Sequence, residues 1–571
     1  MYFKDVRPLS EPAMNILRKR YFLPGEKSWK ELVQRVIDTV LVECKDEEQK
    51  QLTYEMILNR YFIPNSPCLV NSGKKTGGLA ACFVVDFPDT TEGIIKTKGD
   101  FFYIARKGGG CGASLSKLRP EGSKVSGSSH GYAGGPVKFA DTISHDMEAI
   151  TQAGFREMAI MFTMSVYHPD IIKFITAKEV EGRLSNANMS VTVDDAFMNK
   201  VENDMEYQTY FNLEPVDGKK NTILGPKYKA RDIFNLMIEG AWKNGEPGIL
   251  FYNRINDSPY KYSNQEIIST NPCGEQPLPS NGVCNLGSID ISKFLTNEGF
   301  LDLKKLEITT RLGVRLLDSV ITHTSYPTPE IEKWSIENRP VGLGIMGVAD
   351  YFLMKEIAYG SEQSLIDLAF ILDFINKIAE DESIKLGEEY GIPESCKRLP
   401  NPRRNITLLT IAPTGTVSII AGCTSGIEPI FSEIVIRNDK TGTYTFENDL
   451  AEKPYFRCAV STNNAVEVTW EEHVKIQATA QKFVDSGVSK TINFPNHTHR
   501  ETIYNSFILA WKLGCKGLAI YRNMSRKVEV LTPKNLKKNL CPVCSTELIE
   551  VNKVKKCPNV SCGFILTEFS Q

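Results

Sequence analysis

Between about residue 65 and residue 531, short runs of β-branched residues alternate with longer helical stretches. The strand-like runs include Phe83-Val-Val, Met189-Ser-Val-Thr-Val193 and Ile406-Thr-Leu-Leu-Thr-Ile411, and the helical stretches include 305–324 and 363–387. Alternation of this kind indicates parallel strands, because a parallel pair needs a crossover connection, usually a helix, between its strands. The sequence therefore predicts an α/β core.

The segments on either side of this core have different patterns. Residues 11–60 carry apolar side chains at helical spacing, among them Leu32, Val33, Val36, Ile37 and Val40. After a lysine-rich stretch at 534–538, the end of the chain contains two pairs of cysteines. We expect three parts: an N-terminal helical region over residues 1–64, a large α/β domain over residues 65–531 and a small module over residues 532–571.

The composition limits the location and partners of the chain. Its 571 residues are 42% apolar, enough for a core larger than that of one small domain. The formal charge of -2, from 67 basic and 69 acidic side chains, gives no overall attraction to nucleic acid or to an anionic membrane. There is no apolar run of membrane-spanning length and no secretory signal. We therefore expect a cytoplasmic protein, in which fourteen cysteines favour redox chemistry or metal binding over structural disulfides.

The motif Asn271-Pro-Cys-Gly-Glu275 places an amide, a thiol and a carboxylate at alternating positions. Residues two apart project to the same side of an extended backbone. Pro272 disfavours a helical conformation for the residue before it, and Gly274 permits close approach of a ligand. We therefore expect an extended, accessible tip from which Asn271, Cys273 and Glu275 face one substrate.

These three groups suit hydrogen-atom chemistry on a sugar. A thiol can lose a hydrogen atom, a carboxylate can take a proton, and an amide can hold a hydroxyl group. The alternative is structural, because most isolated cysteines in folded proteins are buried apolar side chains and the flanking residues are ordinary turn formers. The motif alone leaves both interpretations open.

The longer stretch Asn-Pro-Cys-Gly-Glu-Gln-Pro-Leu at 271–278 resembles the finger loop of the ribonucleotide reductases, in the form typical of the adenosylcobalamin-dependent class II enzymes. Further landmarks of that family follow in the family's order. They are Ser66-Pro-Cys-Leu, Ala80-Ala-Cys-Phe83, Gly108-Gly-Gly-Cys-Gly112, His168-Pro-Asp-Ile171, Pro413-Thr-Gly-Thr-Val-Ser418, Ser489-Lys-Thr-Ile-Asn493 and Lys516-Gly-Leu-Ala-Ile-Tyr-Arg522. The resemblance covers about residues 10–531 and favours the catalytic interpretation.

The resemblance implies a ten-stranded α/β barrel with the 271–275 loop threaded into its centre. It also implies that Cys273 forms the thiyl radical that takes the 3' hydrogen of the ribose, that Glu275 is the general base at the 3'-hydroxyl, and that Asn271 hydrogen-bonds the sugar. Cys82 and Cys284 match the dithiol pair that becomes a disulfide in each turnover. Because they lie far apart in the sequence, only the fold can bring them together, and the alternative is two unrelated buried thiols.

A phosphate site is indicated where Pro413-Thr-Gly-Thr-Val-Ser418 follows a strand-like run and precedes an apolar helix start. Glycine and hydroxyl groups there leave backbone N–H groups free for an anion, although an ordinary capped turn has the same composition. In the family, the residues matching Pro413, Thr414, Gly415, Thr416 and Val417 contact substrate phosphate. Other matched substrate contacts are Ser66, Ala81, Cys82 and Gly110 on the opposite wall, and Asn271, Pro272, Cys273, Gly274 and Glu275 in the finger loop.

Control by nucleotide effectors is also implied. It would use the loops 121–135 and 151–160 beside a helix that starts at Asp89-Thr-Thr-Glu92, a pattern typical of a capping box. The family's second loop usually reads Gln-Gly-Gly-Lys-Arg-Arg-Gly, whereas this chain has Gln152-Ala-Gly-Phe-Arg-Glu-Met158. We expect deoxynucleotide or ATP effectors to bind near Asp89 and Arg156, although solvated loop charge also explains Arg156. The short leader predicts no separate ATP-binding cone.

The C-terminal cysteines Cys541, Cys544, Cys557 and Cys562 follow the spacing Cys-x2-Cys-x12-Cys-x4-Cys. Four thiolates at such spacing predict a tetrahedral zinc site in a zinc-ribbon-like hairpin. Class II relatives instead use tail cysteines to reopen the active-site disulfide, and metal-bound thiolates exchange poorly. Either one pair is free for exchange, or a thioredoxin- or glutaredoxin-like dithiol protein reduces the site directly.

Adenosylcobalamin as the radical source rests on the resemblance, because the chain has no Asp-x-His-x-x-Gly motif for a histidine ligand to cobalt. A class I large subunit would need a separate radical-generating subunit and a tyrosine relay, whereas Tyr521 lies within a class II landmark. A glycyl-radical enzyme would need an Arg-Val-x-Gly-Tyr-like tail, which the sequence lacks. A nucleotide-binding sensor of the same fold would have no need of five catalytic positions. The family further implies a homodimer that acts on ribonucleotides, with diphosphates as the expected substrates.

Overall fold

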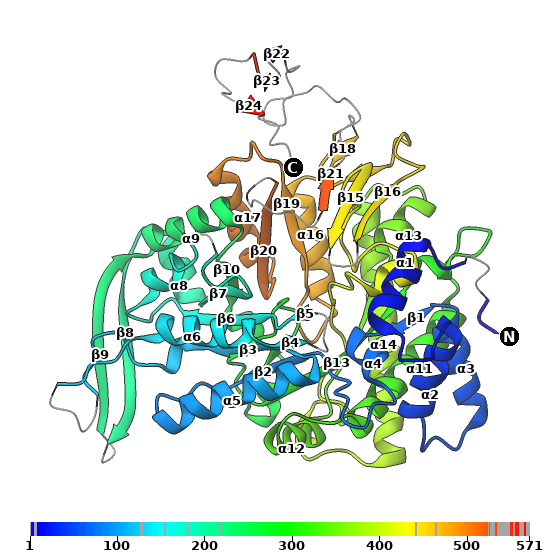
Figure 1. The fold of residues 1–571 in the computed structure, drawn as a ribbon, viewed down its shortest axis with the longest axis horizontal. Coiled ribbons are helices and arrows are strands. Elements are labelled where there is room, and N and C mark those ends of the chain that lie inside the picture. Colours follow the sequence, from blue (N-terminus) through cyan, green and yellow to red (C-terminus); the bar gives the residue numbers. More distant parts are fainter. Residues whose placement is uncertain are drawn as a thin grey trace.

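The fold is built around one large sheet flanked by helices (Figure 1). The computed structural model describes residues 2–4, 8–125, 130–152, 156–180, 182–216, 219–439, 442–462, 465–523, 525, 531–533, 549–551, 554–558 and 565–566. Strands and helices alternate along most of this length, as the sequence predicts. The chain is therefore a mixed α/β protein.

The large sheet has ten strands in the order β1, β13, β2, β3, β6, β7, β10, β20 and β19, with β14 also paired to β13. Their bounds are β1 Phe62–Pro64, β2 Cys82–Val85, β3 Gly110–Ser114, β6 Ile160–Ser165, β7 Ala187–Val193, β10 Gly248–Phe251, β13 Gly282–Asp290, β14 Val341–Met346, β19 Thr491–Phe494 and β20 Gly517–Arg522. The strands from β2 to β10 run parallel to one another, as do β13 with β14 and β19 with β20. The junctions β2–β13 and β10–β20 are antiparallel, so these strands form three parallel groups, each opposite in direction to the next.

The predicted strand at 406–411 is not a continuous strand. It makes two isolated parallel bridges, Leu343 to Leu409 and Ile411 to Val488. The backbone N–H groups of Leu408 and Leu409 donate to Asp485 Oδ2 at 2.7 and 3.2 Å. Because a side chain takes these donors, a regular ladder cannot form there. The segment nevertheless lies between β14 and the residues that lead into β19.

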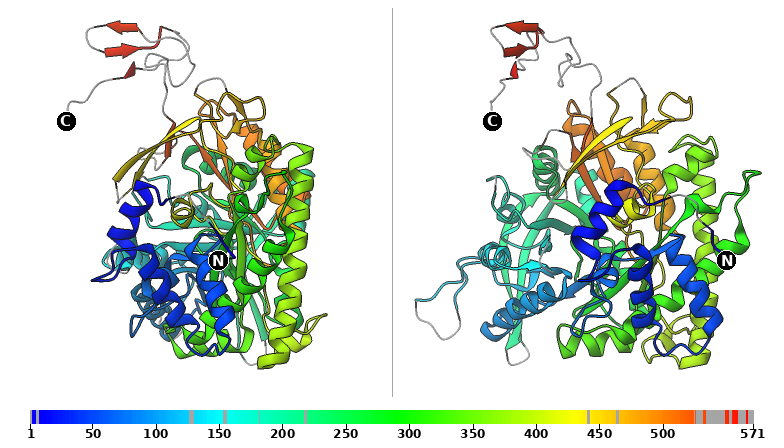
Figure 2. Two further views of the ribbon diagram at one scale, coloured as in Figure 1. Left: turned by 90° about the vertical axis from the view of Figure 1, so that its right-hand side faces the viewer. Right: turned by 45° about the vertical axis from the view of Figure 1, so that its right-hand side comes forward.

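The N-terminal helices predicted over residues 11–60 are present as α1 Glu11–Ile16, a π-helical turn Leu17–Tyr21, α2 Trp29–Val40 and α3 Glu47–Leu58. The apolar positions predicted for α2 are all buried, and Ser28 and Glu31 form a capping box at its start. The predicted central helices are α11 Leu303–His323 and α14 Glu362–Tyr390. Helix α11 packs against α14 and against α2 and α3 (Figure 2), so the N-terminal helices join the core of the large domain.

Further helices surround the sheet: α4 Ser66–Asn71, α5 Thr91–Lys107, α6 Pro136–Glu148, α7 Ile171–Ile175, α8 Asp195–Glu202, α9 Ala230–Asn244, α10 Tyr252–Asn256, α12 Pro329–Asn338, α13 Val348–Met354, α15 Val417–Ala421, α16 Trp470–Gln481 and α17 Arg500–Lys512. Smaller sheets pair β8 Glu206–Val216 with β9 Lys219–Lys229, β17 Arg457–Cys458 with β18 Val466–Glu467, and β15 Ile434–Asp439 with β16 Gly442–Glu447 and β21 Leu531–Pro533. Strands β22 Ile549–Val551, β23 Val554–Lys556 and β24 Ile565–Leu566 form a separate antiparallel sheet.

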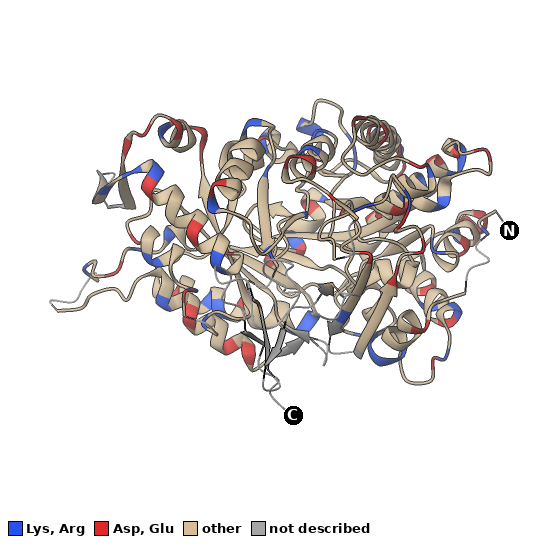
Figure 3. Cartoon of the chain, turned by 90° about the horizontal axis from the view of Figure 1, so that it is seen from above, with Lys and Arg blue, Asp and Glu red and all other residues tan. Residues whose placement is uncertain are grey.

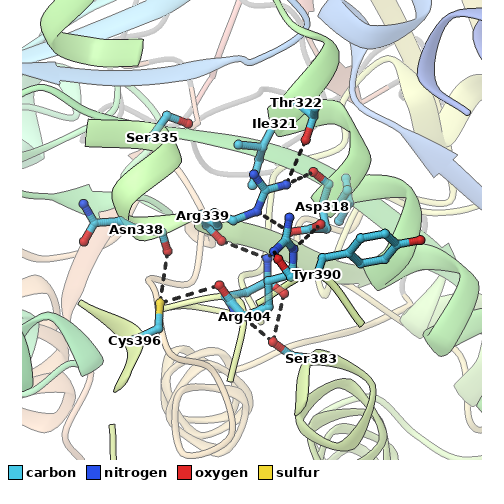
Figure 4. A network of polar contacts seen from close by, with 12 residues as sticks. Asp318, Ile321, Thr322, Ser335, Asn338, Arg339, Ser383, Tyr390, Cys396 and Arg404 are labelled. Carbon is cyan, nitrogen blue, oxygen red and sulfur yellow. Dashed lines mark hydrogen bonds and ion pairs between the residues drawn. The ribbon is translucent and has the colours of Figure 1, made fainter. Parts of the chain in front are cut away.

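A buried polar network fixes the residues before β14 and before the 406–411 segment (Figure 4). Asp318 of α11 accepts hydrogen bonds from Arg339 Nε, Arg404 Nε and Asn405 Nδ2, each at 2.8 Å. The Arg404 guanidinium also stacks on the Tyr390 ring at the end of α14. One carboxylate thus ties together two helices and two strand-like segments.

The surface charge is mixed. Seen from above, basic and acidic residues are interleaved along the described chain (Figure 3). Within the ranges that the structure describes, every helix is too short or too polar to cross a lipid bilayer.

Candidate active site

The motif at 271–275 forms the tip of a short hairpin between β11 Ser269–Thr270 and β12 Pro277–Leu278. The Gly274 N–H donates to the Asn271 carbonyl at 3.0 Å, and the Asn271 N–H donates to the Gln276 carbonyl at 3.2 Å. Gly274 has a φ of 80°, which favours glycine. The expectation of an extended tip is therefore wrong, because proline and glycine close a tight turn around Cys273.

Residues from several parts of the large sheet hold this hairpin. The Glu275 carbonyl accepts from Thr410 Oγ1 and from the Gly487 N–H, each at 2.8 Å. The Pro272 carbonyl accepts from Asn188 Nδ2 of β7 at 2.7 Å. Gly112 of β3 lets the loop approach closely, because a Cβ there would lie 1.9 Å from the Thr270 carbonyl oxygen.

Local sequence does not mark Thr410, Gly487, Asn188 or Gly112 as supports of the loop. Each lies in a segment whose local pattern is that of an ordinary strand or turn. Gly112 lies inside a landmark, but its packing against the hairpin has no local signal. Only the tertiary contacts give these residues their function.

Cys82 and Cys284 are brought together by strand pairing. Cys82 begins β2 and Cys284 lies in β13, and the antiparallel register places the two residues directly opposite each other. Both are buried and both are free thiols. Cross-strand neighbours in such a register have Cβ atoms about 4.5–5.5 Å apart. The fold therefore places the two thiols side by side.

The finger loop adds an amide and a carboxylate to this thiol pair. Asn271 Nδ2 donates to Cys82 Sγ at 3.2 Å, and Cys82 Sγ donates to Glu275 Oε1 at 3.8 Å. The Asn271 side-chain oxygen is held by the Gln276 N–H at 2.9 Å, which fixes the direction of its amide. Cys273 at the tip is exposed, unlike the other four residues.

Burial sets the protonation states of these groups. It raises the pKa of Glu275 to about 7, against hydrogen bonds from Asn271 and Cys82 that lower it. Glu275 Oε2 is buried and has no hydrogen-bond partner among the described residues. Burial, followed by the charge of Glu275, raises the pKa of Cys82 and of Cys284 well above the ordinary thiol value. At neutral pH the site therefore holds two protonated thiols beside a carboxyl group that can give or take a proton.

Among the predicted substrate contacts on the wall opposite the phosphate loop, Ala81, Cys82 and Gly110 lie close to one another. The Gly110 N–H donates to the Ala81 carbonyl at 2.8 Å, and a Cβ on Gly110 would lie 3.0 Å from the Pro272 ring. Ser66 is half-buried at the start of α4, where its hydroxyl lies 2.7 Å from the Tyr21 hydroxyl. The structure thus brings Ala81, Cys82 and Gly110 together beside Pro272.

The predicted phosphate loop 413–417 leads into α15, a helix of five residues. Thr414 has a φ of 49°, and its hydroxyl accepts from the Gly426 N–H at 2.8 Å. Gly415 faces open space, because a Cβ there would meet no atom within 4 Å, and its carbonyl accepts from Arg437 Nη1 at 3.1 Å. The loop is therefore held by contacts from Gly426 and Arg437, and it leaves open space beside Gly415.

The predicted effector residues are placed only in part. Asp89 pairs with Arg119, with Oδ2 at 2.7 Å from Arg119 Nε. The expected capping box between Asp89 and Glu92 is wrong, because Thr90 is the N-cap and accepts from the Gly93 N–H. Arg156 lies in the two-residue strand β5, paired with β4 Thr151–Gln152, and its side chain is outside the described part of the structure.

The zinc prediction cannot be followed in the structure. Cys541, Cys544 and Cys562 lie outside the described residues, and Cys557 alone lies within them. Among the described residues, no group of three or more histidine, cysteine or acidic side chains could hold a metal ion. A separate open hollow of about 560 Å³, lined by Trp242 and residues 496–501, contains none of the predicted site residues.

Comparison with known proteins agrees with this geometry. The profile of the ribonucleotide reductase barrel domain matches residues 80–401, 399–455 and 447–521, and the profile of the all-alpha domain of ribonucleotide reductase matches residues 7–77. The chain belongs to the ribonucleotide reductase family.

Three relatives illustrate the similarity. A vitamin B12-dependent ribonucleoside-diphosphate reductase from Thermoplasma acidophilum is 38% identical over 511 residues, which cover 84% of this chain and 66% of that protein. A protein of the same name from Mycobacterium tuberculosis is 33% identical over 573 residues, which cover 93% and 81%. The ribonucleoside-diphosphate reductase large chain of Cryptosporidium parvum is 27% identical over 495 residues, which cover 76% and 62%. The chain thus spans slightly under two thirds of the length of the first relative.

Proposed function

We propose that this chain is a vitamin B12-dependent reductase that converts ribonucleoside diphosphates to 2'-deoxyribonucleotides by thiyl-radical chemistry, for DNA synthesis. The proposal rests above all on the cross-strand pair Cys82 and Cys284 beside Glu275 and Asn271. A nucleotide sensor would have no use for a reducible pair next to a titratable carboxyl group. The names of the two most similar relatives described above support the cofactor and the diphosphate.

The residues of the finger loop have distinct tasks in this reaction. The Cys273 sulfur, as a thiyl radical, takes the 3' hydrogen of the ribose, and its exposure leaves it open to a substrate and to a radical source. Glu275 takes the proton of the 3'-hydroxyl, for which a pKa of about 7 is suitable at neutral pH. Asn271, with its amide direction fixed, donates to a sugar oxygen once substrate displaces its contact with Cys82.

The two electrons come from the dithiol pair. The Cys82 and Cys284 thiols give up two hydrogen atoms in total, an S–S bond forms, the C2'–O bond breaks, and the 2'-hydroxyl leaves as water. The radical at C3' then recovers its hydrogen from Cys273. High thiol pKa values suit this step, because hydrogen transfer needs protonated sulfur.

The exposure of the Cys273 thiol fits the use of adenosylcobalamin as the radical source. When bound, that cofactor supplies an organic radical able to remove a hydrogen atom from a thiol. Cys273 is the exposed thiol of the site, whereas the paired thiols are buried, with Cys82 3% and Cys284 1% exposed. Oxidation from outside would therefore reach Cys273 and leave the dithiol pair protected.

Substrate binding and barrel closure complete the proposed catalytic domain. The diphosphate would lie against the open glycine of the 413–417 loop, with Ser66, Ala81 and Gly110 on the other wall. The bridges of 406–411 to β14 and to Val488 support closure of the ten strands into a barrel around the loop. We propose the domain limits 1–64, 65–531 and 532–571, as the sequence predicts.

Effector binding and dimerisation also belong to the proposal. Helix α5 exposes Ile95, Phe102 and Tyr103, which form an apolar face suited to a second copy of the chain. Asp89 lies just before α5 in the sequence, and Arg156 lies in β5, whose partner strand β4 contacts α5. A deoxynucleotide or ATP effector would bind near these two residues. A homodimer joined through α5 would place both effector loops near the interface.

The disulfide formed in each turnover has to be reduced again. Both thiols are buried, so the reducing thiols have to reach into the site. Either a pair of tail cysteines would carry the electrons from a thioredoxin- or glutaredoxin-like protein, or that protein would reduce the site directly while the tail cysteines hold zinc in a ribbon. We also propose a cytoplasmic location, where such dithiol reductants are present.

The decisive experiment incubates the purified chain with each ribonucleoside diphosphate, dithiothreitol and adenosylcobalamin, and measures deoxyribonucleotide. We expect product without any second subunit. Product only after addition of a radical-generating subunit would assign the chain to the class I type. No product under any effector, with nucleotide binding intact, would favour a sensor and refute the proposal.

A further inference from the structure

A fully buried cation, Lys490, is linked to the predicted phosphate loop through its ion-pair partner Glu428. Lys490 immediately precedes β19, and its side chain is 0% exposed. Its ammonium group donates to Glu428 Oε2 at 2.7 Å and to the Thr491 carbonyl at 3.3 Å, and it lies 2.8 Å from His473 Nδ1. An ammonium group has three donors, so all of them are used. The catalytic steps above make no use of this group.

The partner Glu428 is committed through both of its oxygens. Oε2 accepts from Lys490, and Oε1 accepts from the Thr491 N–H at 2.7 Å. Burial, followed by the charge of Lys490, holds the pKa of His473 well below its ordinary value, so His473 is neutral and accepts from the lysine. Both oxygens of Glu428 are therefore hydrogen-bonded to residues at the start of β19.

The residues just before Glu428 contact the phosphate loop. The Gly426 N–H donates to Thr414 Oγ1 at 2.8 Å, and the Ser425 hydroxyl lies 3.0 Å from the Ser418 hydroxyl in α15. The Ile427 carbonyl accepts from the Tyr359 hydroxyl. Segment 425–427 is thus a support between the buried ion pair and Thr414.

Thr414 needs such a support. Its φ of 49° is a left-handed conformation that residues with a side chain rarely adopt, and surrounding contacts have to stabilise it. The observed contact from Gly426 reaches its hydroxyl directly. If segment 425–427 shifted, Thr414 would relax and the open Gly415 beside it would move.

We propose that Lys490 and Glu428 are positioning residues that hold the 413–417 loop in the conformation that binds the anionic group of the nucleotide. The inference rests on the proposed function, because that function assigns the loop to phosphate. The pair acts through Gly426 and Thr414 and does not touch substrate. It should therefore affect nucleotide affinity much more than the chemical step.

The test is Glu428→Gln, which keeps the shape of the side chain and removes its charge. We expect KM and the equilibrium Kd for a ribonucleoside diphosphate to rise roughly tenfold or more, with kcat within about twofold of wild type. Thr414→Val, which removes only the hydroxyl acceptor, should give the same pattern, and Thr414→Ser should restore wild-type binding. If Glu428→Gln fails to fold, the neutral double variant Lys490→Met with Glu428→Gln replaces it.

A matched control is Glu382→Gln in α14, whose carboxylate pairs with Arg311 and Arg315 of α11 away from the loop. It should lower the melting temperature and leave KM unchanged. If Glu428→Gln behaves like this control while Thr414→Val still weakens binding, the positioning role is refuted and the phosphate loop remains. If Thr414→Val also leaves Kd unchanged, the Thr414 hydroxyl does not hold the loop and the inference is wrong, whereas the assignment of phosphate to the backbone N–H groups of the loop is unaffected.

Discussion

Two buried carboxylates in this protein have opposite surroundings. Burial alone would raise the pKa of Asp318, but the charges of Arg339 and Arg404 outweigh it and leave the pKa below its ordinary value. Glu275 faces a thiol and an amide instead, and burial raises its pKa to about 7. Its Oε2 atom has no hydrogen-bond partner within the described part of the chain.

The difference separates a structural from a reactive group. Asp318 is fixed in one charge state by two cations and an amide, so it can only hold its neighbours together (Figure 4). Glu275 keeps a free acceptor and a proton affinity near neutrality, so it can exchange a proton with a substrate. A pKa near neutrality, together with an oxygen that has no partner among the described residues, distinguishes the carboxylate that we propose to be catalytic.

The largest effect expected in this comparison comes from the sulfur beside Glu275. Cys273→Ser should abolish deoxyribonucleotide formation, because a hydroxyl group does not form the radical that a thiol does. Since Cys273 is exposed, the melting temperature should change little. The control is Cys44→Ser, a half-buried cysteine of the N-terminal region. Product formation by the Cys273→Ser variant would refute the radical role of Cys273 and, with it, the proposed function.

Glu275→Gln should lower the rate roughly 10²- to 10⁴-fold, because an amide cannot accept the proton of the 3'-hydroxyl. The free energy of unfolding should fall little or rise, since a neutral amide suits a buried site better than an ionised carboxylate. Rate assays and urea unfolding on the same preparation check both parts. A stable variant with wild-type rate would contradict the general-base assignment.

Asp318→Asn should show the reverse pattern. It leaves two buried arginines without their shared carboxylate, so the free energy of unfolding should fall by about 3–5 kcal/mol. The rate per folded molecule should stay close to wild type, because the network does not face the finger loop. A loss of rate without a loss of stability would show that the two carboxylate clusters are not separate in function.

The smallest effect concerns pH. A general base has to be ionised, and the pKa of Glu275 is raised to about 7, so kcat/KM of the wild-type protein should rise about tenfold per pH unit below 7 and level off above it. The Glu275→Gln variant should lack this rise of kcat/KM with pH. A midpoint near 4.5 in the wild type would mean that substrate-free Glu275 is solvated and that its burial does not control the reaction.

Local sequence predicted most elements of the fold. Helices α2, α11 and α14 appear where apolar spacing places them, and β2 and β7 appear at their β-branched runs. Two of the errors come from competition for hydrogen bonds that the sequence pattern does not reveal. Thr90 replaced Asp89 as the N-cap, and Asp485 took the backbone donors of the 406–411 run. In both cases a neighbouring hydrogen-bonding side chain decided the outcome.

The candidate site likewise has features that the sequence predicted and features that it did not. The resemblance to the ribonucleotide reductases named its five proposed reactive residues, and strand register placed Cys82 opposite Cys284. The sequence did not predict the tight turn at Cys273, the left-handed Thr414 or the supports Thr410 and Gly487. These depend on contacts between segments far apart in the chain, which leave no periodic signal.

By itself the sequence determined the alternation of strands and helices, the family to which the chain belongs and the chemical groups available at the finger loop. These follow from residue type and spacing, which are local properties. Tertiary structure alone decided that two distant thiols become neighbours, that Glu275 is buried with one oxygen lacking a partner among the described residues, and that Lys490 is buried in an ion pair with Glu428. Burial and strand register arise only when the whole sheet has formed, and they set the proton affinities on which the proposed reaction depends.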